Sequence, residues 1–223
     1  MCYAPYVSFG TFIIELMLAL FFLIKNPKDK LNRFIAAISF MLGFYQLNEF
    51  LICTTKLNLF TRMGIGTTAI LPAMAISYAL IMWRKRIKWY WNILIYLPAV
   101  FFIVVFALPI SFTTSAICNL VFIQWPNAGL YSKFFGFYYT IYLLGAAILF
   151  YFSVANCKDK ILKRLYYLGM LGMFIFTVPT FVFLQFLPSQ GIQFPSILCE
   201  FALLLAIEFV FVIWYKEKHK LRF

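Results

Sequence analysis

The charged side chains of this 223-residue chain are gathered into short clusters, and the stretches between the clusters carry almost none. Residues 63–83 contain no charged residue, and residues 89–132 form a longer uncharged run. A helix needs roughly 20 mostly apolar residues to cross a bilayer, because the hydrocarbon core is about 30 Å thick and each helical residue rises about 1.5 Å. The spacing of the charges therefore predicts a chain that crosses a membrane several times as α-helices.

The composition excludes a water-soluble fold. Hydrophobic residues make up 65% of the chain and charged residues 12%, whereas soluble domains average about 45–50% apolar and roughly 25% charged residues. A globule of this length has too little interior to bury 29 Phe and 14 Tyr side chains, so most of these rings must face lipid or each other. Open β-sheets are excluded as spans, because unpaired backbone groups cannot face lipid.

Seven apolar segments are long enough to serve as spans, and we expect residues 1–223 to form a single seven-helix membrane domain. The predicted spans are 7–24, 34–53, 63–83, 91–110, 131–156, 165–187 and 196–215. The predicted fold class is all-α: a polytopic bundle with almost no soluble part.

Basic residues alternate between the two sides of the predicted membrane. All but three of the 19 Lys and Arg residues fall in the first, third and fifth loops and the C-terminal tail; the exceptions are Lys56, Arg62 and Lys133. Cytoplasmic loops carry an excess of Lys and Arg. The pattern predicts a multi-pass protein of the cell membrane (inner or plasma membrane), with its N-terminus outside and its C-terminus in the cytoplasm. We therefore interpret the net charge of +12 as a topology signal, with the lipid bilayer and not a nucleic acid as the partner.

One short motif occurs twice. The segment NPKDK at 26–30 recurs as NCKDK at 156–160, and IMWRKR at 81–86 resembles VIWYKEK at 212–218 at nearly the same offset. This predicts a parallel repeat of three helices, one connecting helix and three helices, a plan found among small transporters. The alternative interpretation is that basic helix ends that follow aromatic residues resemble one another.

Four glutamates lie inside the predicted spans: Glu15, Glu49, Glu200 and Glu208. An ionisable side chain within a span costs roughly 2.5–3.5 kcal/mol on insertion scales, and it must face the bundle interior or a wet cavity. Glu49 and Glu200 fall about 6 Å below the outer surface, whereas Glu15 and Glu208 lie nearer the middle. The alternative for each is a protonated carboxyl group that is hydrogen-bonded to a neighbouring helix.

Other polar residues fall near Glu49 and Glu200 and predict a pocket for a ligand or ion in the outer leaflet. The lining residues that we expect are Gln46, Asn48, Glu49, Thr68, Cys199 and Glu200.

Four of the five cysteines fall on the predicted outer side: Cys2, Cys53, Cys118 and Cys199. An oxidising exterior permits a disulfide among them, and the preferred member is Cys2 or Cys118. Alternatively, thiolates and carboxylates hold a soft metal ion, or these cysteines are simply small hydrophobic residues. No other cofactor is expected. The only histidine, His219, lies in the tail, which excludes histidine-ligated haem, and the seventh span has no lysine for a retinal Schiff base.

Four short segments carry further motifs: MCYAPYVSF at the start, ISFMLGFYQLNEFLIC in the second span, ILPAM around Pro72 and SILCEFALLL in the seventh span. Together they resemble an uncharacterised family of bacterial seven-helix membrane proteins. By position, the resemblance marks Cys2, Gln46, Glu49, Pro72, Ser196 and Cys199. Many members of that family carry a His and an aromatic residue just before this proline, where this chain has Thr68 and Leu71, and this departure argues against a metal or proton-relay role that involves such a His. The resemblance implies the fold and no established activity.

We predict a small carrier or transporter in which Glu49 and Glu200 bind the coupled proton or cation. The chain has no GxSxG, Walker or GxGxxG motif, and no catalytic residue is expected. One alternative is a receptor-like module that binds an amphiphile, and another is a structural subunit of a larger complex with other membrane subunits or a second copy of the chain. A third alternative is an intramembrane thiol or metal enzyme that uses Cys2, Cys53 and Cys199.

Overall fold

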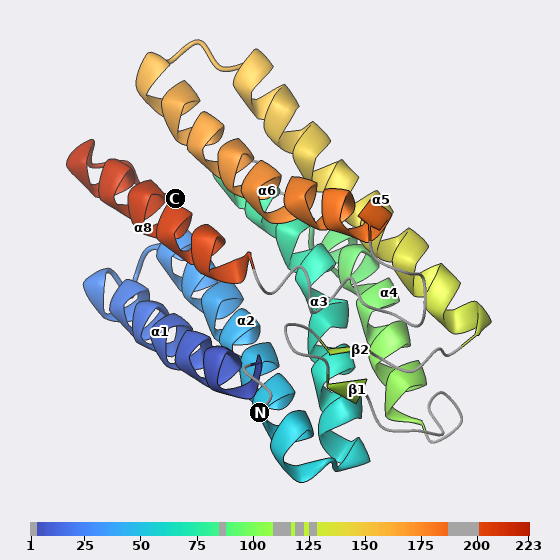
Figure 1. Cartoon of the computed structure of the whole chain (residues 1–223). Coiled ribbons are helices and arrows are strands. Elements are labelled where there is room, and N and C mark those ends of the chain that lie inside the picture. The colour runs from blue at the N-terminus through green and yellow to red at the C-terminus, as the bar shows by residue number, and fades with distance from the viewer. Residues whose placement is uncertain (1–3, 85–87, 109–116, 119–122, 125–128, 187–200) are drawn as a thin grey trace.

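The computed structural model describes residues 4–84, 88–108, 117–118, 123–124, 129–186 and 201–223. Within these ranges the helices are α1 (Ala4–Lys25), α2 (Lys30–Thr55), α3 (Asn58–Met82), α4 (Trp89–Ala107), α5 (Leu130–Ala155), α6 (Lys160–Phe186) and α8 (Ala202–Lys218). Two short strands, β1 (Ile117–Cys118) and β2 (Ile123–Gln124), pair antiparallel between α4 and α5. The all-α fold class is confirmed (Figure 1).

Six of these helices, α1 to α6, are long and apolar enough to cross a membrane, which fits a membrane-embedded, multi-pass protein. The described part of α8 has 17 residues. The predicted seventh span starts at residue 196, so its first residues lie outside the described part of the chain. The parallel repeat and the N-outside orientation stay predictions.

Helix α3 is the central helix of the bundle (Figure 1). It packs against α2, α4 and α5, while α1 packs along α2, and α6 packs against both α5 and α8. Helix α4 is peripheral, since it buries only Ala99, Phe102 and Phe106. Many of its other apolar side chains, such as Leu97 and Val104, are exposed. A broad exposed apolar face of this kind suits contact with lipid.

Aromatic rings fill many of the contacts between helices. Tyr78 of α3 meets both Phe150 of α5 and Phe209 of α8 edge to face, with ring centroids 5.5 Å apart in each pair. Phe102 of α4 lies 5.2 Å from Phe135 of α5. Such pairs contribute about 0.5–1.5 kcal/mol beyond the burial of their area. The rings thus pack against each other in the interior, as their number in the sequence requires.

The recurring NPKDK and NCKDK motifs each start a helix. The side chain of Asp29 accepts hydrogen bonds from the backbone N–H groups of Leu31 and Asn32, at 3.0 and 3.1 Å. The side chain of Asp159 accepts one from the N–H of Ile161, at 2.8 Å. Aspartate is a preferred residue at this position, because its oxygen satisfies N–H groups that lack a partner in the first helical turn. Helix capping therefore accounts for the aspartate in both copies of the motif.

Three of the basic clusters meet at one end of the bundle, which we call the basic end. There the backbone N–H of Lys30, at the start of α2, donates to the carbonyl of Phe223, at 3.4 Å. The guanidinium of Arg84, just after α3, donates to the carbonyl of Arg222, at 3.1 Å. Clusters that are far apart in the sequence are thus brought together by helices that run in alternating directions.

The opposite end, which we call the disulfide end, is tied by a covalent bond. Cys53 near the end of α2 and Cys118 in β1 form a disulfide, with their Cα atoms 5.8 Å apart. Nearby, the guanidinium of Arg62 in α3 donates to the carbonyl of Ala107, the last residue of α4, at 3.0 Å. These bonds hold the ends of α2, α3 and α4 and the β1 strand in place.

Candidate functional site

Glu49 is buried near the disulfide end of α2, with 3% of its surface exposed. One carboxylate oxygen accepts a hydrogen bond from the hydroxyl of Tyr45, one turn earlier in the same helix, at 2.7 Å. The other oxygen accepts one from the hydroxyl of Ser8 in α1, at 3.2 Å. Glu49 thus connects α1 to α2 through a short hydrogen-bond network.

The other described members of the predicted outer pocket are buried as well: Gln46, Asn48 and Thr68. The amide of Asn48 donates to the carbonyl of Phe44 at 2.7 Å, and the hydroxyl of Thr68 donates to the carbonyl of Ile65 at 2.8 Å. Both side chains therefore satisfy their donors within their own helix, as polar side chains in helices often do. Cys199 and Glu200 lie outside the described residues, so the predicted pocket stays a prediction.

Glu15 and Glu208 are buried, and neither carboxyl group has a hydrogen-bond partner within the described part of the chain. Each of them packs against a glycine of a neighbouring helix. A Cβ atom at Gly43 of α2 would lie 3.4 Å from an oxygen of Glu15, and one at Gly172 of α6 would lie 2.6 Å from an oxygen of Glu208. An ionised carboxyl group without a partner is very costly in an apolar interior, so this packing suits uncharged side chains.

The described cysteines are separated between the two ends of the bundle. Cys53 and Cys118 form the disulfide, and Cys157 between α5 and α6 is free. Cys2 and Cys199 belong to the ranges that the structure does not describe. Among the described residues, no three His, Cys, Asp or Glu side chains come together as a metal site.

A buried ion pair at the basic end was not foreseen from the sequence. The ammonium group of Lys216 in α8 lies 2.9 Å from a carboxylate oxygen of Asp29, and both side chains are almost fully buried. Lys216 also donates to the side chain of Asn32, and the second oxygen of Asp29 accepts the backbone N–H of Phe223 at 3.3 Å. The local sequence predicts that Asp29 neutralises its basic neighbours, but its partner comes from a helix almost at the other end of the chain.

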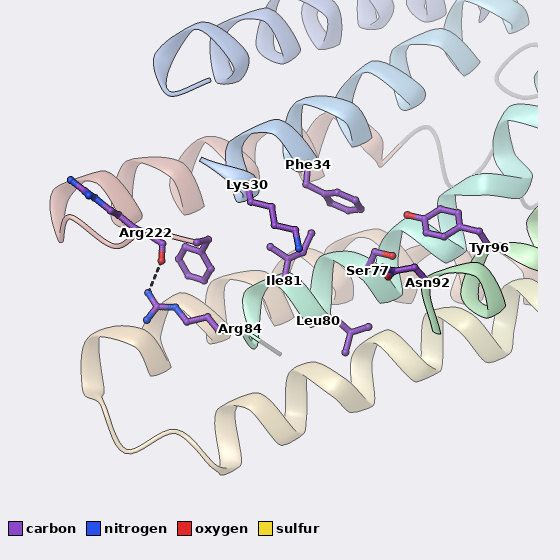
Figure 2. Close-up of a pocket in the computed structure, with 10 residues that line it drawn as sticks. Lys30, Phe34, Ser77, Leu80, Ile81, Arg84, Asn92, Tyr96 and Arg222 are labelled. Atoms are coloured by element: carbon purple, nitrogen blue, oxygen red, sulfur yellow. Dashed lines mark hydrogen bonds between the residues drawn. The ribbon is translucent and has the colours of Figure 1, made fainter. Parts of the chain in front are cut away.

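Beside this ion pair, a cavity of about 830 Å³ enters the bundle between α2, α3, α4 and the C-terminal residues (Figure 2). Its lining residues are Lys30, Phe34, Ser77, Leu80, Ile81, Arg84, Asn92, Tyr96, Arg222 and Phe223. Ligand pockets usually measure about 300–1,000 Å³, so the volume is enough for a small organic molecule.

The cavity has a basic mouth and a polar inner part. Figure 2 shows Lys30 reaching from α2 toward α3, while Ser77, Asn92 and Tyr96 gather farther inside. Ser77 lies five residues before the end of α3 and therefore about 8 Å into the bundle. Its hydroxyl is buried and interacts with the hydroxyl of Tyr96, which lies beside it in the inner part of the cavity.

Arg84 forms one wall of the cavity mouth. Its guanidinium donates to the carbonyl of Arg222 and lies 4.5 Å from the ring centroid of Phe223. The guanidinium of Arg222 itself extends away from the cavity (Figure 2). Among the described lining residues, the cations that face the cavity are thus those of Lys30 and Arg84. From the sequence both are interpreted as topology markers, and this cavity is not predicted. The signal that would have indicated it is the set of polar residues inside neighbouring spans: Ser77, Asn92 and Tyr96.

A layer of apolar side chains lies in the middle of the bundle. A gap of about 30 Å³ lies there, between side chains of α2, α3, α5, α6 and α8 that include Leu42, Leu71, Leu143 and Phe209. This layer separates the cavity at the basic end from the Glu49 network at the disulfide end.

No family model, curated protein or solved structure matched this chain. The resemblance to bacterial seven-helix membrane proteins therefore stays a prediction, and an account of function has to start from the geometry.

Proposed function

We propose that the protein is a small membrane carrier and that the cavity at the basic end is its solute-binding site in this conformation. The observation that supports this proposal is the cavity itself: about 830 Å³, with exposed basic residues at its mouth and a polar inner part that ends at an apolar layer. A carrier that works by alternating access is expected to be open to one side and closed to the other around a site within the bundle.

A coupled carrier also needs a site for the proton or cation, and the candidate for it lies on the opposite side of the apolar layer. Glu49 is buried there among hydroxyl groups of α1 and α2. In this proposal Glu49, together with Glu200, binds the coupled proton or cation. The basic end faces the cytoplasm, because basic loops are retained on that side. The cavity is then the inward-facing site of a cell-membrane protein.

The arrangement favours a carrier over two of the alternatives, the thiol enzyme and the structural subunit. An intramembrane thiol enzyme requires reactive cysteines beside a cavity, but among the described cysteines Cys53 is joined to Cys118, and Cys157 does not line the cavity. A purely structural subunit has no need for a polar cavity of this size. The exposed apolar faces of α1 and α4 suit lipid or a neighbouring membrane subunit equally, so they do not discriminate between these roles.

Counterflow in proteoliposomes tests the proposal. Purified protein is reconstituted, and uptake of radiolabelled organic anions, organic cations and neutral sugars is measured against vesicles preloaded with the same solute. We expect one class to exchange with the wild type and to stop with Ser77→Trp, which fills the inner cavity. Thr54→Trp, on an exposed position at the disulfide end, is the matched control and should still exchange. Absence of exchange for every class, with folded protein that keeps its disulfide, would contradict the proposal.

A further inference from the structure

We infer that the cavity at the basic end binds a phosphate group, carried either by a soluble organic phosphate or by the headgroup of an anionic lipid. This inference rests on the proposed function, because it names the chemistry of the solute that the same cavity takes. It begins with the charges that face the cavity.

The cations at the cavity mouth are not paired with acidic side chains of the described residues. Within the described residues, neither Lys30 nor Arg84 forms an ion pair, and no acidic side chain lines the cavity. The nearest acid in sequence, Asp29, is fully occupied. It pairs with Lys216, caps α2 and accepts the N–H of Phe223. Because this carboxylate is buried and engaged elsewhere, the positive charge of Lys30 remains available to a ligand.

The two cations are also of the types that recognise phosphate. The guanidinium of an arginine presents several N–H donors in a plane and binds phosphate through paired hydrogen bonds, while lysine supplies a compact point charge. Arg84 uses one donor on the carbonyl of Arg222 and is held against the ring of Phe223, which fixes its position at the cavity wall. Its remaining donors are free to face an anion.

The rest of the lining indicates what accompanies the phosphate. The polar side chains of Ser77, Asn92 and Tyr96 lie farther inside, whereas Phe34 and Ile81 supply apolar wall between the two polar regions. The cavity therefore suits a molecule with a phosphate at one end and a hydroxyl-bearing group at the other. A glycerol phosphate unit has this pattern, both free and within a phospholipid.

Binding measurements on the full chain test the inference in two arms. In the first arm, glycerol 3-phosphate is titrated by calorimetry into protein in neutral detergent. In the second arm, protein in phosphatidylcholine nanodiscs is compared with protein in nanodiscs that also contain phosphatidic acid, and stabilisation against thermal unfolding is measured. Binding in the first arm identifies a soluble phosphate, and stabilisation in the second alone identifies a lipid headgroup. Either result supports the phosphate site.

The variants distinguish specific binding in the cavity from a general attraction of phosphate to the basic surface. We expect Lys30→Gln and Arg84→Gln each to weaken binding by roughly tenfold or more, as loss of a charged hydrogen bond does. Lys28→Gln removes the same charge at the same end from an exposed side chain that does not line the cavity, and it should leave affinity within about twofold. If Arg84→Gln fails to fold, Arg84→Lys replaces it. This variant keeps the charge, so we expect a smaller loss of affinity.

Two results would overturn the inference: no binding of either phosphate probe by the wild type, or equal weakening by Lys28→Gln and Lys30→Gln. The failure of the inference is distinct from the failure of the carrier proposal. Exchange of a neutral or cationic solute in the counterflow assay without phosphate binding removes only the phosphate ligand. Phosphate binding without exchange of any solute removes the carrier and leaves a phosphate-binding membrane protein.

Discussion

The two ends of the bundle hold their buried polar groups by different means. At the disulfide end, the carboxylate of Glu49 is satisfied by hydroxyl groups, and a covalent bond joins Cys53 to Cys118. At the basic end, the buried charge of Asp29 is balanced by Lys216 from a distant helix. Beside that pair a cavity keeps further cations without acidic partners in the described part of the protein.

This difference indicates that the two ends have different tasks. Hydrogen bonds and a disulfide at one end favour a single closed arrangement. At the other end the ion pair fixes α8 against α2, and the adjoining space is left for an anion. The comparison yields four expectations about stability, from the largest effect to the smallest, each measured as unfolding in mixed micelles titrated with a denaturing detergent.

The buried ion pair should carry the largest effect. Lys216→Met leaves the carboxylate of Asp29 buried without its partner, and removal of one member of such a pair costs about 3–5 kcal/mol. Lys218→Met, an exposed neighbour in the same helix, should change stability by less than about 0.5 kcal/mol. The double variant Asp29→Asn with Lys216→Met should recover part of the loss. Equal effects of the two single lysine variants would show that the ion pair of Lys216 does not stabilise this end of the bundle.

Loss of the disulfide should cause the second largest loss of stability. Cys53→Ser together with Cys118→Ser opens a loop of 65 residues, and removal of a disulfide typically costs about 2–4 kcal/mol. Cys157→Ser changes the free cysteine between α5 and α6 and should be nearly neutral. If the basic-end cavity still binds its ligand in the double serine variant, the two ends act separately, as the comparison requires.

The tightness of packing around α5 and α6 can be compared at two glycines, one in each helix. A Cβ atom at Gly169 of α6 would lie 2.7 Å from the ring of Phe150, which is fully buried, whereas one at Gly136 of α5 would meet nothing within 4 Å. Gly169→Ala should therefore destabilise the protein by about 1–3 kcal/mol through overpacking. Gly136→Ala should be neutral or stabilising by about 0.5–1 kcal/mol, because alanine favours helix. The opposite order would contradict the close contact at Gly169.

The smallest effect is expected at Glu49. Glu49→Gln keeps the size of the side chain but replaces one of its two accepting oxygens with an NH₂ group, which cannot accept the hydroxyl donor of Tyr45 or Ser8, at a cost of about 0.5–1.5 kcal/mol. Tyr45→Phe removes one of the donors. In a double-mutant cycle the two changes should be coupled, since the residues are in contact. Strict additivity would show that the Tyr45 hydroxyl does not bind this carboxylate.

The spacing of the charges was sufficient to predict an all-helical bundle with long apolar helices, because lipid imposes both the length and the composition of a span. The partners of Asp29 could not be predicted in this way. Asp29 and Asp159 share the same motif and both cap helices, but only Asp29 lies where α8 brings a lysine. Which helices become neighbours is a tertiary property that the local motif does not contain.

The candidate site was predictable only in part for a related reason. Polar residues inside spans indicate interior faces, and Gln46, Asn48, Glu49 and Thr68 are indeed buried. Polarity alone did not distinguish Thr68 and Asn48, which bond to their own helices, from Ser77, which faces a cavity. The basic residues Lys30 and Arg84 fit the topology rule so well that their position at the cavity was not anticipated.

Substituted-cysteine accessibility tests the central claim most directly: the cavity admits solutes from the basic end. Ser77→Cys is placed in a background with Cys2, Cys157 and Cys199 changed to serine, and sealed vesicles of each orientation are treated with a membrane-impermeant maleimide. The side that carries the basic loops is defined by labelling of Lys220→Cys, and Ser39→Cys, a fully buried position of α2 that does not line the cavity, is the control. We expect Ser77→Cys to be labelled from the basic side alone and Ser39→Cys to stay unlabelled. Labelling of Ser77→Cys only from the disulfide side, or not at all, would contradict the account.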